Sequence, residues 1–137
     1  METSAIELLA GLPAFAEYFA VGLALIGVFL VVYVWMTPYP EIRLIREGNA
    51  AASASLSGAI VGFVLPLASA VENSSSLVDM LVWALIALLV QLLAYFLVHR
   101  LLPHLPRDVA DGKIASGVFL AAIAICFGLL NAACMSY

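Results

Sequence analysis

Four long apolar runs divide this sequence, and they constrain its fold more than any other feature. The runs cover residues 13–36, 49–71, 77–98 and 114–135, and no basic residue interrupts any of them. About 20 helical residues, each rising ~1.5 Å, cross a hydrocarbon core of ~30 Å. Each run is long enough for this, so the sequence predicts an all-α integral membrane protein with four transmembrane helices.

The composition supports a membrane location. Hydrophobic residues make up 66% of the 137 residues and charged residues only 10%, whereas soluble domains are about 45–50% apolar and about 25% charged. So few polar side chains could not cover the surface of a soluble domain of this size. We expect contact with membrane lipid and no binding of nucleic acid, because the five cations form no basic stripe.

The positions of the cations predict the orientation. All five lie between the first and second runs or between the third and fourth, and cytoplasmic loops are enriched in Lys and Arg. We therefore expect the loops near 37–48 and 99–113 to be cytoplasmic and both termini to be periplasmic, in a bacterial inner membrane. The cations are Arg43, Arg46, Arg100, Arg107 and Lys113.

An internal repeat divides the chain into two halves. A shift of 64 residues aligns Gly48 with Gly112, and each half reads as a spanning helix, a proline-bearing turn, a short charged segment, a glycine and a second spanning helix. Because each half has an even number of spans, we expect parallel repeats related by an axis along the membrane normal. This predicts two helical hairpins, residues 1–71 and 72–137, side by side in a four-helix bundle.

Two local signals predict a separate helix before the first span. Ser4 and Glu7 have the spacing of a capping box, which marks the start of a helix. A short interfacial helix from Ser4 would stop at Gly11, and Pro13 could then open the first span, because proline is favoured at the first helical position. We therefore expect a break between residues 11 and 13.

Small residues recur every four positions along the second span. In lipid, helices gain little from burying apolar side chains, so small residues that allow close backbone approach become packing surfaces. Gly58 and Gly62 form a GxxxG pattern. The stripe predicts a groove for a partner helix, either from the same chain or from a second subunit. The predicted packing residues are Ala50, Ala54, Gly58, Gly62 and Gly128, with lesser faces that include Ala16, Ala20 and Ala24.

Polar residues in the later spans have two interpretations. Pro66 removes a backbone donor and leaves the carbonyl of Gly62 without its helical partner, which costs several kcal/mol in hydrocarbon. Asn131 is expected at a similar depth, where its amide could reach this carbonyl, while Ser57 and Gln91 share a depth nearer the middle. A polar path or substrate site could be lined by Ser57, Gln91 and Asn131 together with the helix break at Pro66. We favour interhelical hydrogen bonding, because the repeat contains no mirrored site.

Few other side chains suggest chemistry. Glu17 is the candidate intramembrane acid; we expect it to be solvated near the outer surface, and proton or cation handling is the alternative. The spacing of His99 and His104 suits no metal site. Cys126 and Cys134 lie ~12 Å apart along a helix, too far to pair, although Cys134 could bridge two subunits. No nucleophile–base pattern, phosphate loop or metal motif is present, so we expect neither an enzyme nor a cofactor.

Three segments carry a resemblance to a known family. They are IREGN at residues 45–49, GFVLPL at 62–67 and GLLNAACM at 128–135. With them, nearly the whole chain resembles a family of bacterial inner-membrane proteins called domain of unknown function 350, in which the two-helix unit occurs in two copies. The resemblance implies no established activity. Members are often encoded near ATP-grasp-type ligases and envelope-stress proteins, which suggests a role in membrane maintenance.

Two hypotheses of function follow. The first is a non-enzymatic homo-oligomeric subunit of the inner membrane that acts as a scaffold in envelope maintenance or stress, with other envelope proteins as partners. The alternative is an oligomeric channel or small transporter for ions or polyamines, with Pro66 and Asn131 beside the path. The two differ in where Gln91 and Asn131 point: into a packed helix seam, or into a shared water-filled axis.

Overall fold

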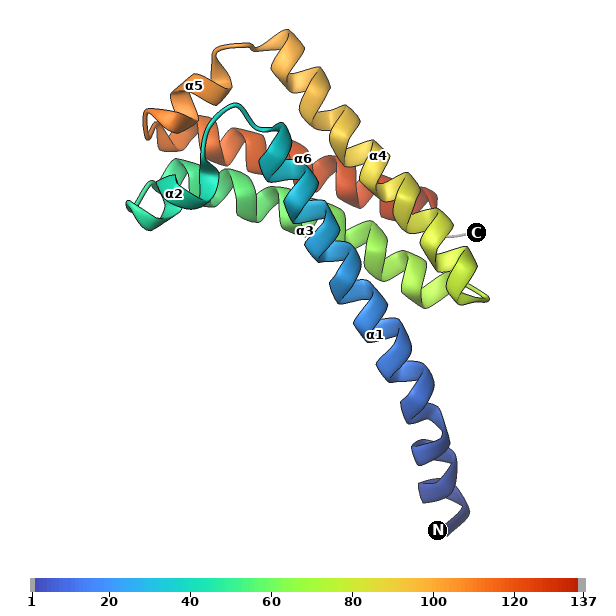
Figure 1. Ribbon diagram of the computed structural model, residues 1–137. Coiled ribbons are helices and arrows are strands. Elements are labelled where there is room, and N and C mark those ends of the chain that lie inside the picture. Colours follow the sequence, from blue (N-terminus) through green and yellow to red (C-terminus); the bar gives the residue numbers. More distant parts are fainter. Residues whose placement is uncertain (1, 136–137) are drawn as a thin grey trace.

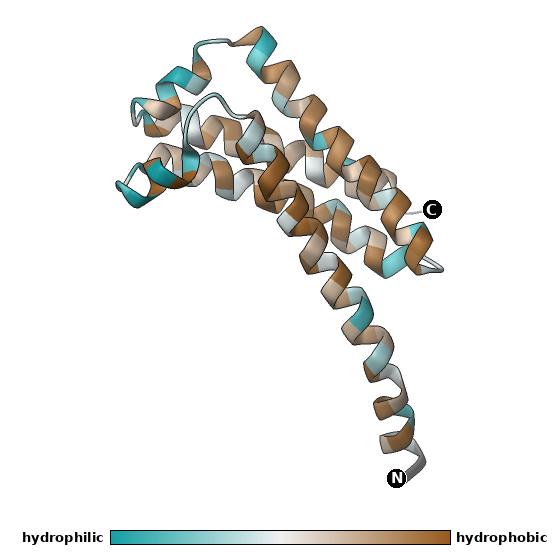
Figure 2. Ribbon diagram, in the orientation of Figure 1, coloured by the Kyte–Doolittle hydropathy of each residue, from teal (hydrophilic) through white to brown (hydrophobic). Residues whose placement is uncertain are grey.

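The computed structural model describes residues 2–135, and this part of the chain contains six helices (Figure 1). Four of them, α1, α3, α4 and α6, are long and apolar enough to cross a membrane, and in Figure 2 their ribbons are coloured mostly as hydrophobic residues. This confirms the predicted all-α fold with four spans. The helices are α1 (Glu2–Met36), α2 (Glu41–Arg46), α3 (Ala50–Asn73), α4 (Leu77–Leu101), α5 (Leu105–Ala110) and α6 (Ile114–Cys134).

Helices α3 and α6 form the closest pair in the bundle. They lie side by side along most of their lengths and run in the same direction (Figure 1). Helix α4 packs against both of them, while α1 packs against α3 and α4 less extensively. The principal helix contact therefore joins the second spans of the two halves, rather than the two spans of one predicted hairpin.

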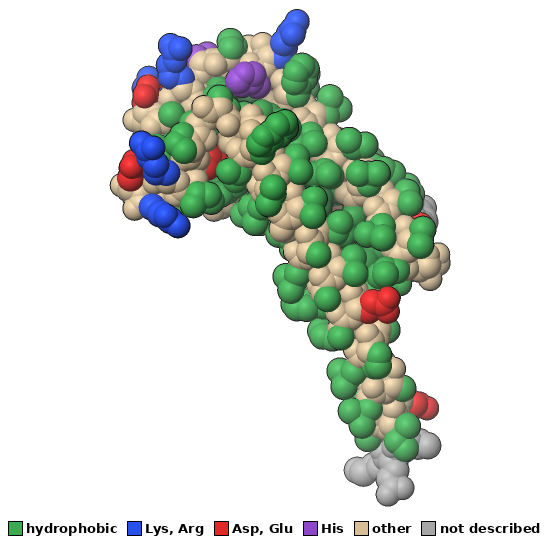
Figure 3. All heavy atoms as spheres, viewed as in Figure 1, with side chains coloured by type: hydrophobic (Ala, Val, Ile, Leu, Met, Phe, Trp, Pro, Cys, Tyr) green, Lys and Arg blue, Asp and Glu red, His purple; other side chains and the backbone are tan. Residues whose placement is uncertain are grey.

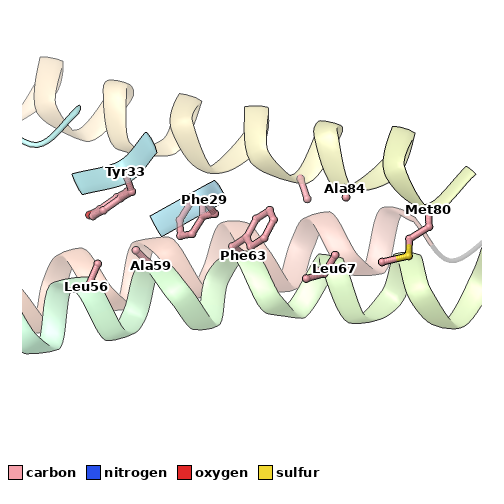
Figure 4. Close-up of a cluster of buried hydrophobic side chains, with 9 residues drawn as sticks. Phe29, Tyr33, Leu56, Ala59, Phe63, Leu67, Met80 and Ala84 are labelled. Carbon is pink, nitrogen blue, oxygen red and sulfur yellow. The ribbon is translucent and has the colours of Figure 1, made fainter. Parts of the chain in front are cut away.

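The core lies between the C-terminal half of α1 and helices α3 and α4. Figure 4 shows Phe29 of α1 beside Phe63 of α3, while Tyr33 lies further along α1 on the side of Leu56. The rings of Phe29 and Phe63 stack with centroids 4.6 Å apart, an arrangement worth about 0.5–1.5 kcal/mol beyond its buried area. These aromatic contacts attach α1 to the bundle. The other buried members are Leu56, Ala59, Leu67, Met80, Ala84 and Ala87.

The N-terminal part of α1 projects away from the bundle (Figure 1). We call residues 4–20 the α1 arm; within it only Tyr18 is even half-buried. The predicted break before the first span is absent, because α1 is one helix that includes both Ser4 and Pro13. An internal proline removes one hydrogen bond, whereas a break in an apolar segment would leave several backbone groups unsatisfied.

The two short helices lie at one end of the bundle with all five cations (Figure 3). We call this the basic end. The turns that follow α2 and α5 have the same geometry, with φ of 87° at Gly48 and 84° at Gly112. In each turn the glycine N–H donates to a carbonyl three residues earlier, Ile45 or Val109, over 3.0 Å. The matching turns support the predicted repeat.

Candidate functional site

Glycines bring the backbones of α3 and α6 into direct contact. A Cβ atom added at Gly58 would overlap Ala121, one at Gly62 would overlap Ala124, and one at Gly128 would overlap the backbone of Gly62. Such contact adds dispersion and polar interactions that larger side chains would prevent. The partner of the predicted groove is thus a helix of the same chain. We call this contact the glycine seam; its glycines are Gly58, Gly62, Gly117 and Gly128.

The predicted stripe enters the seam only in part. Gly58 and Gly62 are buried, whereas Ala54 is half-buried and Ala50 is exposed. Ala51 takes the place of Ala50, and its backbone lies where a side chain on Gly117 would go. The reason is helical geometry: at about 100° per residue, each four-residue step drifts by about 40° around the helix. A strict four-residue stripe therefore leaves the contact face within three steps.

Gln91 of α4 joins the two helices of the seam. Its amide Nε2 donates to the carbonyl oxygen of Gly62 at 2.9 Å and to that of Ala124 at 3.1 Å. The Gly62 carbonyl is the one that Pro66 leaves without a helical donor. Depth along the spans predicted Asn131 as the donor to this carbonyl. The donor is instead Gln91, because α4 directs a longer amide side chain into the same seam.

The other polar candidates do not form a continuous path. Pro66 is buried in α3, whereas Ser57 is exposed on the same helix. Asn131 is half-buried, and its Nδ2 has no hydrogen-bond partner among the described residues. A contact that sequence reasoning missed lies nearby, where the Ser69 hydroxyl donates to the Ala132 carbonyl at 3.3 Å. Of these polar side chains, Gln91 and Ser69 thus donate hydrogen bonds to backbone carbonyls of the seam helices.

The remaining candidates lie outside this network. Glu17 is exposed on the α1 arm. Cys126 and Cys134 are exposed free thiols. In the part of the chain that the structure describes, no three His, Cys, Asp or Glu side chains come together as metal ligands. The structure therefore places Glu17, Cys126 and Cys134 in no common site within the described part of the chain.

Asn49 links the two halves at the basic end. Its Oδ1 accepts a hydrogen bond from the backbone N–H of Ala52 at 3.0 Å and so caps α3. Its Nδ2 donates to the carbonyls of Val109 at 3.0 Å and Ala110 at 3.3 Å, at the end of α5. One amide thus satisfies a helix start and a helix end. Asparagine after Gly48 is the sequence signal that could have predicted the cap, although not the link to α5.

A buried carboxylate lies beside this link. Glu41, the first residue of α2, is 0% exposed, and both of its oxygens lack hydrogen bonds of good geometry to any described residue. Tyr33 and Tyr39 are buried near it. Sequence reasoning missed Glu41, because it considered this segment only as a short charged segment between two spans. The repeat offers a signal, since the equivalent residue 64 positions later is Leu105.

Burial changes the acidity of this carboxylate. Loss of solvation raises the pKa of Glu41 from 4.5 to about 7, and the neighbouring Tyr39 hydroxyl opposes part of this rise. The pKa of the Tyr39 hydroxyl is itself raised, first by burial and then by the negative charge of Glu41. A carboxyl group of this kind can exchange a proton near neutral pH.

The fold and the seam define a helical, multi-pass membrane protein of the glycine-packed type, and comparison with known proteins gives its family. The family model described as Domain of Unknown Function (DUF350) matches residues 7–135, and the chain belongs to this family. No solved structure matches this chain.

Two curated relatives extend this result. The chain is 39% identical over 131 residues to the UPF0719 inner membrane protein YjfL of Escherichia coli K12, covering 96% of this chain and 99% of the relative. It is 24% identical over 120 residues to the UPF0719 transmembrane protein YshE of Bacillus subtilis 168, covering 86% of this chain and 90% of the relative.

Proposed function

We propose that the chain is a non-enzymatic inner-membrane subunit that self-associates through α1 and serves as a scaffold in envelope maintenance or stress. In this proposal the basic end faces the cytoplasm and both termini face the periplasm, in keeping with the preference of cations for cytoplasmic loops. The occupied glycine seam leaves the small residues of α1 as the available self-association face. This unpartnered face of α1 is the observation that carries the proposal.

One face of α1 is lined by small residues that are exposed in the part of the chain that the structure describes. Ala16, Ala20, Ala24 and Gly27 are all exposed, and a Cβ atom added at Gly27 would meet no atom within 4 Å. They follow the four- and three-residue spacing that places side chains on one side of a helix. This small-residue face would let a second helix approach closely in lipid.

The adjoining face of α1 forms a groove with α3. The groove has a volume of about 800 Å³, and Phe15, Phe19 and Leu23 of α1 line it together with Leu67 and Val71 of α3. A small-residue face and an apolar groove that adjoin each other on one helix are complementary between copies, not within one. We infer a second copy as the occupant, with the small-residue face of one α1 in the groove of the next. Repeated head-to-tail contacts of this kind form a ring when the rotation between copies closes and an open filament when it does not.

The orientation of Gln91 supports a scaffold over a channel within one copy. Its amide is directed into the packed seam, where it bonds two backbone carbonyls. A transport path in this chain would have to form between subunits, so flux of ions or polyamines is retained as a second readout of the test.

The test places bulky residues on the small-residue face of α1. The full chain is purified in detergent and in nanodiscs, and its mass distribution is measured by light scattering for wild type, for Ala20→Leu with Ala24→Leu, and for Ala122→Leu. Ala122 is an exposed alanine on α6 and provides the matched control. Two leucines at a close helix contact should each weaken association by about 1–3 kcal/mol.

We expect oligomers for wild type and for Ala122→Leu, and a shift toward monomers for the double variant. A monomeric wild type in both environments, or a double variant with an unchanged distribution, would end the self-association proposal. Flux of potassium or spermidine into wild-type liposomes above that of empty vesicles would favour the channel hypothesis over the scaffold.

A further inference from the structure

The buried carboxylate of Glu41 lacks the partners that would stabilise an ionised group. It occupies the first position of α2, with no exposed surface and no described hydrogen-bond partner of good geometry. An ionised carboxylate in such a place is costly unless a positive charge or several donors compensate it. The two cations of the same helix do not compensate it: Arg43 pairs with Glu47 at 3.4 Å on the surface, and Arg46 is exposed.

The second half of the molecule shows what this position needs structurally. Leu105 is the equivalent first residue of α5, and it is also buried, at 6% exposed. Leucine therefore serves at the matching place beside a turn of the same geometry. A glutamic acid at residue 41 gives up this apolar contact, and packing alone does not account for it.

Side chains from α1, the α1–α2 connection, α3 and α4 surround Glu41. They include the phenols of Tyr33 on α1, Tyr39 on the α1–α2 connection and Tyr95 on α4. Helix α3 contributes Ser55, whose buried hydroxyl has no hydrogen-bond partner of good geometry in the described chain. The Tyr95 hydroxyl is also buried and unsatisfied. The surroundings are hydroxyl-rich and uncharged, which suits a neutral carboxylic acid better than a carboxylate.

We propose that Glu41 is a proton-binding site, which holds α2 against the bundle as a neutral acid and loosens α2 when it ionises. The ligand is a single proton, which needs no cavity of its own. This inference is independent of self-association, since every group that it uses belongs to one copy of the chain.

A route for the proton lies at the basic end. A pocket of about 320 Å³ opens there, and Tyr39, His99 and Arg107 are among the residues that line it. Tyr39 therefore contacts both this pocket and the carboxyl group of Glu41. His99 stacks on Tyr95 with ring centroids 5.9 Å apart. Tyr39 thus lies beside both the acid and this pocket.

The direction of the pH effect follows from linkage. Because the docked form holds its proton up to a pH of about 7, whereas a solvated glutamic acid loses it near 4.5, docking is strongest below pH 4.5 and weakens as pH rises through 7. Between pH 6 and pH 8 the docking equilibrium of α2 should fall about tenfold.

The experiment measures hydrogen exchange of the backbone amides of α2 and α5 in the full chain in detergent, between pH 6 and pH 8. Rates are corrected for the intrinsic pH dependence of exchange. Helix α5 is an internal control, since it carries Leu105 in place of a glutamic acid. Glu41→Gln and Glu41→Leu remove the titration, and Glu47→Gln is the matched control at an exposed glutamate.

We expect wild-type α2 to lose about tenfold protection over this range while α5 stays constant, with the same behaviour in Glu47→Gln and a flat profile in both Glu41 variants. Equal pH dependence of α2 and α5 in wild type would overturn the proposal without any variant. A pH-dependent α2 that persists in Glu41→Leu would assign the titration to another group and would also overturn it.

Discussion

The glycine seam and the α1 arm use similar residues with opposite results. In the seam, Gly62 and Gly128 touch backbone to backbone, and larger side chains have no room. Along α1, Ala16, Ala20 and Gly27 are exposed, and a Cβ atom added at Gly27 would meet no atom within 4 Å. Small residues in a membrane helix thus mark a surface that can be approached closely, but they do not say which helix approaches it.

The difference also concerns polar support. The seam is bridged by Gln91 and by the Ser69 hydroxyl, and both donate to backbone carbonyls. The small-residue face of α1 has no polar side chain among its four members. Close packing in lipid becomes specific when hydrogen bonds fix the register of the helices, so the seam should be a permanent contact and the α1 face an exchangeable one.

The strongest test of this contrast is leucine at a glycine. Gly62→Leu should destabilise the folded monomer by about 3 kcal/mol or more, because the backbone of α6 cannot move aside as a flexible side chain would. Gly27→Leu should change monomer stability little, since its Cβ meets nothing. Unfolding by sodium dodecyl sulfate, followed by circular dichroism, measures both. Equal losses in the two variants would contradict the contrast.

Removal of the amide that bridges the seam should have the next largest effect. Gln91→Leu keeps an apolar side chain of similar size but leaves the carbonyls of Gly62 and Ala124 without this donor. We expect a loss of about 1–2 kcal/mol in the same unfolding assay. Gln91→Glu is a useful second variant, since at low pH a protonated carboxyl can still donate to one carbonyl. Stability unchanged in Gln91→Leu would show that packing alone holds the seam.

The link at the basic end should contribute less. Asn49→Ala removes the cap of α3 and the hydrogen bonds to the end of α5, and cap loss typically costs about 1 kcal/mol. Asn49→Asp retains an acceptor for the cap but loses the donor to α5, so it separates the two roles. Hydrogen exchange at α5 should rise in both variants, and an effect confined to Asn49→Ala would assign the whole contribution to the cap.

The surface ion pairs should contribute least. Lys113 lies 3.3 Å from Asp108, and Arg43 lies 3.4 Å from Glu47, with both cations largely exposed. Replacement of either cation by alanine should change the free energy of unfolding by no more than about 0.5 kcal/mol. Measurement at low and high salt checks this. A larger, salt-dependent loss would show that the ion pairs at the basic end contribute substantially to the stability of the fold.

Much of the fold follows from the sequence, because hydropathy over some 20 residues determines which segments cross a membrane. The identity of helix contacts does not follow so directly. Depth along a span placed Asn131 near the Gly62 carbonyl, but rotation of the helices gave that bond to Gln91. Rotation likewise replaced Ala50 with Ala51 in the seam.

Glu41 was missed for a different reason. A helix of six residues at a membrane interface is too short for a periodic pattern to show which side is buried. Only comparison with its repeat equivalent, Leu105, indicates an enclosed position.

The pairing of α3 with α6 has a consequence for biosynthesis. Contacts across the halves join residues such as Asn49 with Val109 and Ser69 with Ala132, separated by 60 and 63 positions. A ribosome adding roughly 5–20 residues per second would take about 3–12 s to supply the missing partner. During that interval the face of α3 that forms the glycine seam is open to acyl chains, to a chaperone of the insertion machinery, or to the α6 of a neighbouring nascent chain. Slow translation between the two halves would therefore favour exchange of spans between molecules.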